Sequence, residues 1–186
     1  MNIMIVGVGG QGTLLASRIL GAVAVGGGYD VKVSEVHGMS QRGGSVVTYV
    51  KYGEKVYSPI IDKGEADIIL AFEILEAYRA LPYLKKGGKM IVNTQKINPM
   101  PVITGACKYP AELEEKLDAK CNLTSLRAAE LAEKAGSIKA VNVVLIGVLA
   151  KSTDVPYDKW IDALKATVPE KFIDMNLKAF DLGYNF

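Results

Sequence analysis

Cysteine and histidine are scarce in this chain of 186 residues, which contains two cysteines and one histidine. Cys107 and Cys121 lie far apart in sequence and neither belongs to a Cys-x-x-Cys pair. This chain alone therefore cannot supply the ligands of an iron–sulfur cluster or of a structural zinc site. His37 has no second histidine and no nearby cysteine, which excludes a histidine metal site and a Cys–His catalytic pair. We expect any redox centre to come from another molecule.

The chain also lacks a strong charge of one sign and a long apolar run. It has 22 basic and 20 acidic residues, scattered along the sequence, so no basic stripe for nucleic acid is visible. The longest apolar segment, residues 140–150, is too short to span a membrane. The N-terminus shows no basic segment followed by a cleavage site. We expect a cytoplasmic protein with reduced thiols, and neither a membrane nor a nucleic acid as partner.

Hydrophobic residues make up 49% of the chain, which is enough for one compact α/β domain over residues 1–186. Apolar runs at residues 3–8 and 66–72 predict strands buried on both faces of a parallel sheet. Residues 13–25 and 73–84 have helical spacing. This β-helix-β order predicts right-handed crossovers. We expect a Rossmann-like three-layer sandwich with a mostly parallel sheet.

Further elements follow from the same patterns. Residues 31–36 predict a second strand, and residues 45–52 and 56–61 predict a β-hairpin across a turn at Gly53 and Glu54. Gly87 and Gly88 predict a break before a strand at 89–93, and residues 98–101 predict a loop. The remaining expected elements are a short strand at 121–124, helices at 111–119, 125–135 and 140–150, the last apolar all round, and two C-terminal helices starting near Asp154 and Thr167.

A glycine-rich turn, Gly7-Val-Gly-Gly-Gln-Gly12, follows the first strand and precedes a helix. Exposed amides and the helix dipole favour an anion at such a turn. Glu35 falls near the end of the second strand, where a ribose-binding acid would sit, so a nicotinamide or flavin enzyme is one hypothesis. Glycine at a tight turn can also serve packing alone. The candidate residues of this turn are Gly7, Gly9, Gly10, Gln11 and Gly12.

The segment at residues 35–45, Glu-Val-His-Gly-Met-Ser-Gln-Arg-Gly-Gly-Ser, is too polar for a core. Arg42 offers a planar fork of donors for a carboxylate or phosphate, and the glycines after it permit close approach. We predict that this loop contacts another molecule. The alternative is a polar turn with Arg42 in a surface salt bridge. The candidate residues of this loop are Glu35, His37, Ser40, Gln41, Arg42, Gly43 and Gly44.

No residue is assigned a catalytic role from its type and spacing. A general base at His37 is conceivable, but we favour an orienting or ligand-contacting role. Ser40 lacks the Gly-x-Ser-x-Gly elbow of serine hydrolases. Asn142, in an apolar helix, needs hydrogen-bond partners; it holds the glycine-rich turn, reaches across an interface or is a structural amide. Asn176 has the same alternatives, and both cysteines are expected to be packing residues.

These two motifs, with Val92-Asn-Thr94, Tyr109-Pro110, Asn142 with Gly147, and Asn176-Leu-Lys-Ala-Phe-Asp-Leu-Gly183, resemble the gamma-type domain of the 2-oxoacid:ferredoxin oxidoreductases nearly end to end. The form His37-Gly-Met-Ser-Gln-Arg42 is similar to the beta subunits of the indolepyruvate branch. The pyruvate and 2-oxoglutarate branches more typically carry Tyr-Gly-Pro-Glu-x-Arg-Gly-Gly. A subunit of another branch is therefore an open alternative.

The resemblance implies oxidative decarboxylation of an aryl pyruvate, with coenzyme A as co-substrate and ferredoxin as electron acceptor. It places thiamine diphosphate and the iron–sulfur clusters in a large alpha subunit, with no cofactor on this chain. This chain would complete the active-site wall and be inactive alone, with Arg42 contacting an anionic group. A free-standing NAD(P)-dependent enzyme and an assembly module without substrate contact are the other hypotheses.

Overall fold

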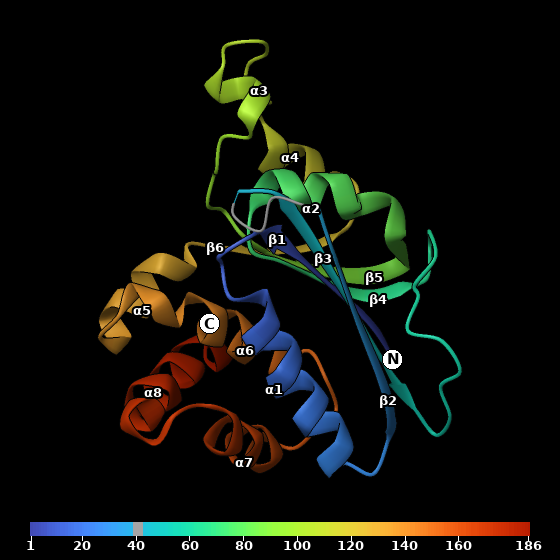
Figure 1. Ribbon diagram of the computed structural model, residues 1–186, viewed down its shortest axis with the longest axis vertical. Coiled ribbons are helices and arrows are strands. Elements are labelled where there is room, and N and C mark those ends of the chain that lie inside the picture. Colours follow the sequence, from blue (N-terminus) through green and yellow to red (C-terminus); the bar gives the residue numbers. More distant parts are fainter. Residues whose placement is uncertain (39–42) are drawn as a thin grey trace.

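A computed structural model describes residues 1–38 and 43–186 of the chain, which form a central sheet with helices on both faces (Figure 1). The described elements are β1 (Asn2–Val8), α1 (Thr13–Gly26), β2 (Asp30–His37), β3 (Ser45–Gly53), β4 (Ala66–Ala71), α2 (Ile74–Ala80), β5 (Leu84–Asn93), α3 (Met100–Ile103), α4 (Leu113–Asp118), β6 (Asn122–Leu126), α5 (Ala128–Ala135), α6 (Val141–Ala150), α7 (Tyr157–Thr167) and α8 (Ile173–Tyr184). Short 3-10 turns occupy Leu81–Tyr83, Ile138–Ala140 and Glu170–Phe172.

The sheet has six strands in the order β2-β3-β1-β4-β5-β6. The pairs β1–β4, β4–β5 and β5–β6 are parallel, whereas β3 is antiparallel to both of its neighbours, β1 and β2. Only β3 therefore runs against the other described strands. The expected sandwich with a mostly parallel sheet is confirmed, and its hairpin is formed by β2 and β3.

Each face of the sheet carries its own hydrophobic core. Ile3 and Ile5 of β1 pack with α1, α5, α6, α7 and α8, whereas Met4 and Val6 pack with α2 and α4. This alternation follows from the two-residue period of a strand. The prediction that β1 is buried on both faces is confirmed.

The predicted strand at residues 56–61 is wrong, because the hairpin partner of β3 is β2 and not the segment that follows it. Both edges of β3 are already occupied by β1 and β2. Residues 56–61 cross the surface instead, held by bonds from the Val56 amide to Asp30 Oδ2 (2.9 Å) and from Lys51 Nζ to the Ile60 carbonyl (2.9 Å). Pro59 also lacks the N–H that a strand interior needs.

The predicted break at Gly87 and Gly88 is also wrong, since β5 runs through both glycines with a register shift against β4. A Cβ atom at Gly88 would lie 2.8 Å from Leu84 Cδ1 and 3.0 Å from the Asp67 carbonyl oxygen. The glycine thus permits close strand approach rather than ending the strand. Part of the predicted loop at 98–101 is the start of α3, and α5 begins at Ala128 because β6 extends to Leu126.

The apolar helix α6 lies inside the molecule, where nine of its ten residues are buried. It packs on α8, and Phe180 of α8 stacks on Trp160 of α7 with ring centroids 6.3 Å apart. This confirms the prediction of a buried helix. No helix among residues 1–38 and 43–186 combines the length and the apolar character that crossing a bilayer requires.

Candidate functional site

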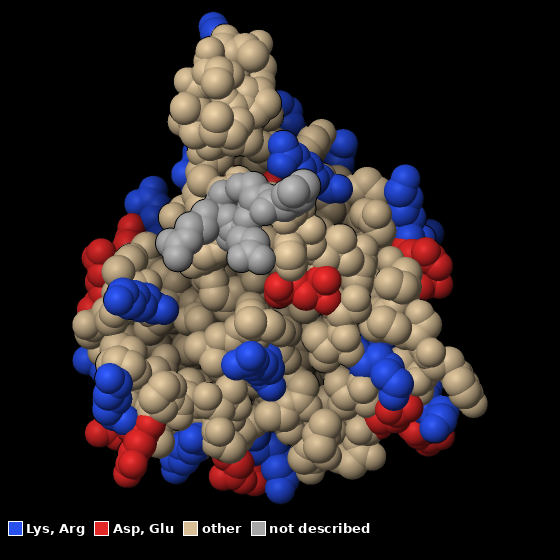
Figure 2. Space-filling view, viewed as in Figure 1, with Lys and Arg blue, Asp and Glu red and all other residues tan. Residues whose placement is uncertain are grey.

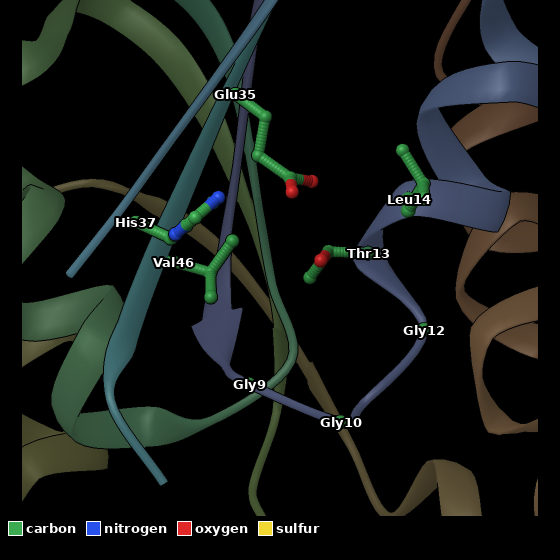
Figure 3. Close-up of a pocket in the computed structure, with 8 residues that line it drawn as sticks. All are labelled: Gly9, Gly10, Gly12, Thr13, Leu14, Glu35, His37 and Val46. Carbon is green, nitrogen blue, oxygen red and sulfur yellow. The ribbon is translucent and has the colours of Figure 1, made fainter. Parts of the chain in front are cut away.

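A pocket of about 430 Å³ lies at the carboxyl end of β1, between the glycine-rich turn and the ends of β2 and β3 (Figure 3). Ligands of open α/β sheets bind outside the carboxyl ends of the strands. The structure therefore brings together residues from both motifs that the sequence singles out. The pocket is lined by Gly9, Gly10, Gly12, Thr13, Leu14, Glu35, His37 and Val46.

The glycine-rich turn adopts a backbone that favours glycine. Gly10 has φ +103° and Gly12 has φ +85°, both in the region that side chains disfavour. Gly12 precedes the first residue of α1, and within the described part of the chain no side chain caps this helix end. The first amides of α1 are therefore available to an anion or to water.

Asn142 packs directly behind this turn. It is 7% exposed, and a Cβ atom at Gly12 would lie 2.7 Å from its Nδ2 atom. Its Oδ1 atom accepts a hydrogen bond from the Val143 amide (2.9 Å). The side chain thus occupies the space that any residue other than glycine at position 12 would need.

Gln11 ties the turn to the neighbouring strands. Its Oε1 atom accepts a bond from the Val8 amide (2.7 Å), and its Nε2 atom donates to the Phe72 carbonyl (3.0 Å) and to Gln95 Oε1 (3.1 Å). Gly7 makes room for this side chain, because a Cβ atom there would lie 2.9 Å from Gln11 Oε1. Both residues shape the turn, and neither lines the pocket of Figure 3.

The backbone of the glycine-rich turn contacts Gly43 and Gly44. The Gly9 amide donates to the Gly44 carbonyl (2.9 Å), and the Gly43 amide donates to the Gly9 carbonyl (3.4 Å). Gly43 has φ +78°. These two glycines therefore approach the chain's own backbone at Gly9, and the approach of another molecule to them stays a prediction. Ser40, Gln41 and Arg42 lie outside the described residues.

Glu35 and His37 reach the pocket from alternate positions of β2 (Figure 3). Both side chains are exposed, and Thr48 Oγ1 donates to Glu35 Oε2 at 3.2 Å. His37 Nδ1 lies 3.0 Å from the Gly38 carbonyl oxygen. Because β3 separates β2 from β1, Glu35 is about 4.8 Å further from β1 than it would be on a neighbouring strand. This placement departs from the expected ribose site.

Glu73 is a buried carboxylate that sequence reasoning missed. It is 1% exposed and follows β4 after one intervening residue, Phe72. Its Oε2 atom caps α2 by accepting from the Glu76 amide (2.9 Å), and its Oε1 atom accepts from the Ile97 amide (3.1 Å) and the Tyr109 hydroxyl. Burial and the Glu73 carboxylate raise the pKa of Tyr109 far above its usual range. An acidic residue directly after an apolar strand was the available signal.

Glu76 is a second buried acid and is 5% exposed. Its Oε2 atom accepts a bond from Ser45 Oγ (2.6 Å), and its Oε1 atom accepts one from Arg79 Nη1 (2.5 Å). Ser45 directly follows Gly43 and Gly44. This contact fixes one end of the polar loop to α2.

The remaining candidates have structural surroundings. Asn176 Nδ2 donates to the Phe172 carbonyl (2.8 Å), as a structural amide would. Cys107 is exposed, and Cys121 is half-buried with Sγ 3.3 Å from the Leu117 carbonyl oxygen. Burial raises the pKa of the Cys121 thiol. Among residues 1–38 and 43–186, no three His, Cys, Asp or Glu side chains are grouped to hold a metal ion.

Residues 2–186 match the family described as pyruvate ferredoxin/flavodoxin oxidoreductase. Indolepyruvate oxidoreductase subunit IorB of Pyrococcus horikoshii is 44% identical over 98% of this chain and 93% of that protein. The 2-oxoglutarate synthase subunit KorC of Methanothermobacter marburgensis is 31% identical over 98% of this chain and 94% of that protein.

A solved structure extends the likeness to the fold. The gamma subunit of a keto/oxoacid ferredoxin oxidoreductase from Geobacter sulfurreducens superposes with a TM-score of 0.74, covering 99% of this chain and 96% of that one. Their sequence identity is 24%, so this structure supports the architecture of the sheet and helices alone.

Proposed function

The chain belongs to the pyruvate ferredoxin/flavodoxin oxidoreductase family, and from that membership we propose that it is the small subunit of an indolepyruvate oxidoreductase. The observation that supports the indolepyruvate branch is that this chain has a higher sequence identity with subunits of that branch than with subunits of the other branches. Four curated relatives named indolepyruvate oxidoreductase subunit IorB are 40–45% identical over 93–95% of their length. Subunits named for pyruvate/ketoisovalerate or 2-oxoglutarate enzymes are 27–31% identical.

In this role the chain takes part in the oxidative decarboxylation of an aryl pyruvate. Coenzyme A and oxidised ferredoxin are consumed, and an aryl-acetyl-CoA, carbon dioxide and reduced ferredoxin are formed. A larger partner subunit holds the thiamine diphosphate and the iron–sulfur clusters. The sequence has two cysteines, fewer than the four thiolates of a cluster, which supports this division of cofactors.

The pocket in Figure 3 is the part of this chain that faces coenzyme A or the substrate. The exposed amide end of α1 attracts a negative group through its dipole. Arg42 adds a guanidinium for a phosphate or carboxylate, and His37 orients the bound group by hydrogen bonding. With Ser40, Gln41, Gly43 and Gly44 these residues complete the wall of an active site whose reacting centre lies on the partner. The whole chain, residues 1–186, acts as one domain in this arrangement.

The test is co-expression with a large subunit that carries thiamine and ferredoxin motifs. The purified complex should reduce a viologen dye with indolepyruvate in the presence of coenzyme A, and the isolated chain should be colourless and inactive. Pyruvate and 2-oxoglutarate serve as control substrates. Preference for either control would assign the chain to another branch, and turnover by the isolated chain would contradict a subunit role.

A second candidate function is a nicotinamide-dependent oxidoreductase, which the Gly-x-Gly-x-x-Gly spacing favours. The position of β3 between β1 and β2 weighs against it, because it displaces Glu35 from the usual ribose position. We expect calorimetric titration of the chain with NAD(H) and NADP(H) to show weak binding or none. Micromolar affinity that is abolished by Gly9→Val would favour the dehydrogenase instead.

A further inference from the structure

Residues 95–110 form a projection, here called the arm, which leaves the sheet after β5 and returns before α4. Figure 1 shows α3 standing beyond the layers of the sheet and helices. In Figure 2 the projection is tan over nearly its whole surface, with a basic side chain at its outer end. The arm is therefore a convex, nearly uncharged surface.

The arm exposes large apolar side chains. No charged residue occurs between Lys96 and Lys108. Met100 is 66% exposed and Ile103 is 64% exposed, and residues three apart share one face of a helix. An exposed apolar patch with a charged rim is typical of a surface that binds another protein.

The arm is anchored and internally bonded. The Glu73 carboxylate accepts hydrogen bonds from both ends of the arm, from the Ile97 amide near its first residue and from the Tyr109 hydroxyl near its last. Within the arm, the Cys107 amide donates to the Pro101 carbonyl (3.1 Å) and Thr104 Oγ1 donates to the Met100 carbonyl (3.0 Å). These bonds hold its shape before any partner arrives, which lowers the ordering cost of binding.

We propose that the arm docks into an apolar hollow of the larger partner subunit, an inference that rests on the proposed function. A convex element needs a concave partner surface. An uncharged hollow matches the uncharged part of the arm, because a charged one would lose its hydration without gaining an ion pair. Lys96 and Lys108 bound the apolar part in the sequence and are exposed. The partner surface therefore carries carboxylates where these ammonium groups reach it, including opposite the basic side chain at the outer end of the arm in Figure 2.

The arm begins at the same end of the sheet as the pocket, which supports one partner for both. Gln95, its first residue, accepts a bond from Gln11 of the glycine-rich turn (3.1 Å). The arm also follows the carboxyl end of β5, while the pocket lies at the carboxyl end of β1. A large subunit that covers the pocket therefore lies within reach of the arm.

The test is a binding titration between the full chain and the separately purified large subunit. The double substitution Met100→Asp with Ile103→Asp places charges on the arm at positions that face solvent. Val25→Asp is the matched control, since Val25 is 65% exposed in the last turn of α1, away from the pocket. We expect the control to bind like the unmodified chain and the double variant to bind at least tenfold more weakly, with the melting temperatures of both variants unchanged.

Cys107 supplies a second readout without any substitution, because it is an exposed thiol on the arm. Its alkylation by a maleimide, followed by mass spectrometry, should slow at least tenfold when the complex forms. A complex that turns over but leaves the Cys107 rate unchanged, or a double variant with normal affinity, would overturn the docking inference alone. Failure of the unmodified chain to bind the large subunit would overturn the proposed function with it. Self-association lost in the double variant, with normal affinity for the large subunit, would assign the arm to a second copy of the chain.

Discussion

Gly10 and Gly12 of the glycine-rich turn differ in the atoms that an added side chain would contact. Gly10 and Gly12 both have positive φ, but only at Gly12 does a Cβ atom collide with a described neighbour, Asn142 Nδ2, at 2.7 Å. At Gly10 no described atom lies within 4 Å of that position. Conformational strain is therefore common to both positions, whereas steric overlap belongs to one.

We expect Gly12→Ala to lower the free energy of unfolding by about 3 kcal/mol, from left-handed strain and overpacking together. Gly10→Ala should cost about 1 kcal/mol, from strain alone. In an Asn142→Ala background the cost of Gly12→Ala should fall by about 1 kcal/mol or more, because the overlap is gone. Urea unfolding of the four variants measures these differences. Equal costs for Gly10→Ala and Gly12→Ala would show that Asn142 does not restrict the turn.

The hydroxyl of Ser45 connects the polar loop to the buried carboxylate of Glu76. Ser45→Ala should lower the free energy of unfolding by about 1 kcal/mol, and Ser45→Thr should restore it, because the hydroxyl is kept. In the assembled enzyme we expect Ser45→Ala to raise KM for coenzyme A or substrate more than it lowers kcat, since the loop loses a fixed end.

Ser125→Ala is the matched control for that prediction. Ser125 Oγ also bonds a carboxylate, Glu114 Oε1 (2.5 Å), but this exposed pair lies outside the pocket. The control should leave KM unchanged. If both alanine variants change KM equally, Ser45 has no special part in positioning the loop.

At the scale of elements, local patterns predicted most of the sheet and helices. Apart from Asn2 in β1, Asp67 in β4 and Asn142 in α6, these three buried elements are apolar, so their burial on every side is visible in the sequence. Residues 56–61 also resemble a strand apart from Pro59, yet β2 already occupies the edge of β3 that they would need. Pairing depends on which edges are free, and a local pattern does not contain that information.

The same distinction applies to the candidate site. Gly9, Gly12, Glu35 and His37 meet in one pocket because each lies next to a strand end that the sequence marks. The role of Glu73 depends on Tyr109, which lies 36 residues later in the chain. Contacts over such distances follow from the packing of α2 and the arm, and neither segment shows them in its own sequence.

The helices α6 and α8 approach each other through two glycines. A Cβ atom at Gly147 would lie 2.2 Å from the Phe180 carbonyl oxygen, and one at Gly183 would lie 2.0 Å from the Val144 carbonyl oxygen. Real Cβ atoms do not come so close to backbone, so either substitution must separate the helices. Close approach of these backbones is therefore a requirement of this side of the core.

Gly147→Ala and Gly183→Ala should each lower the free energy of unfolding by about 3 kcal/mol or more, because overpacking here meets backbone atoms. Gly21→Ala is the control: Gly21 lies inside α1 and no described atom lies within 4 Å of its Cβ position. That substitution should raise stability by about 0.5–1 kcal/mol through helix propensity. Urea unfolding checks all three, and a neutral Gly183→Ala would contradict the close packing.

For the whole molecule, the pocket, the arm and the two buried acids gather at one end of the sheet. The opposite end carries a different feature, a cluster in which Tyr52 of β3 packs against Tyr29 with ring centroids 5.4 Å apart. Burial, with smaller effects from Tyr29, Asp67 and Asp154, raises the pKa of Tyr52 to about 12. This end therefore links the stability of the entire fold to alkaline pH.

The sign of that link follows from the two states of Tyr52. Its pKa is about 10 in the unfolded chain and about 12 in the folded one. Below about pH 10 both states keep the proton and stability is unaffected; above it the unfolded state ionises first. The free energy of unfolding should therefore fall between about pH 10 and pH 12, with Tyr52 contributing at most about 2.7 kcal/mol.

Tyr52→Phe should make this fall shallower by that share, as urea unfolding across the alkaline range would show. Tyr57→Phe is the control, because Tyr57 is 89% exposed, and it should leave the slope unchanged. An equally steep fall in Tyr52→Phe would place the alkaline sensitivity elsewhere. The first alternative is Tyr109, because burial and the Glu73 carboxylate raise its pKa far above its usual range, and the next is Tyr157, whose bond to Asp181 and partial burial raise its pKa to about 12.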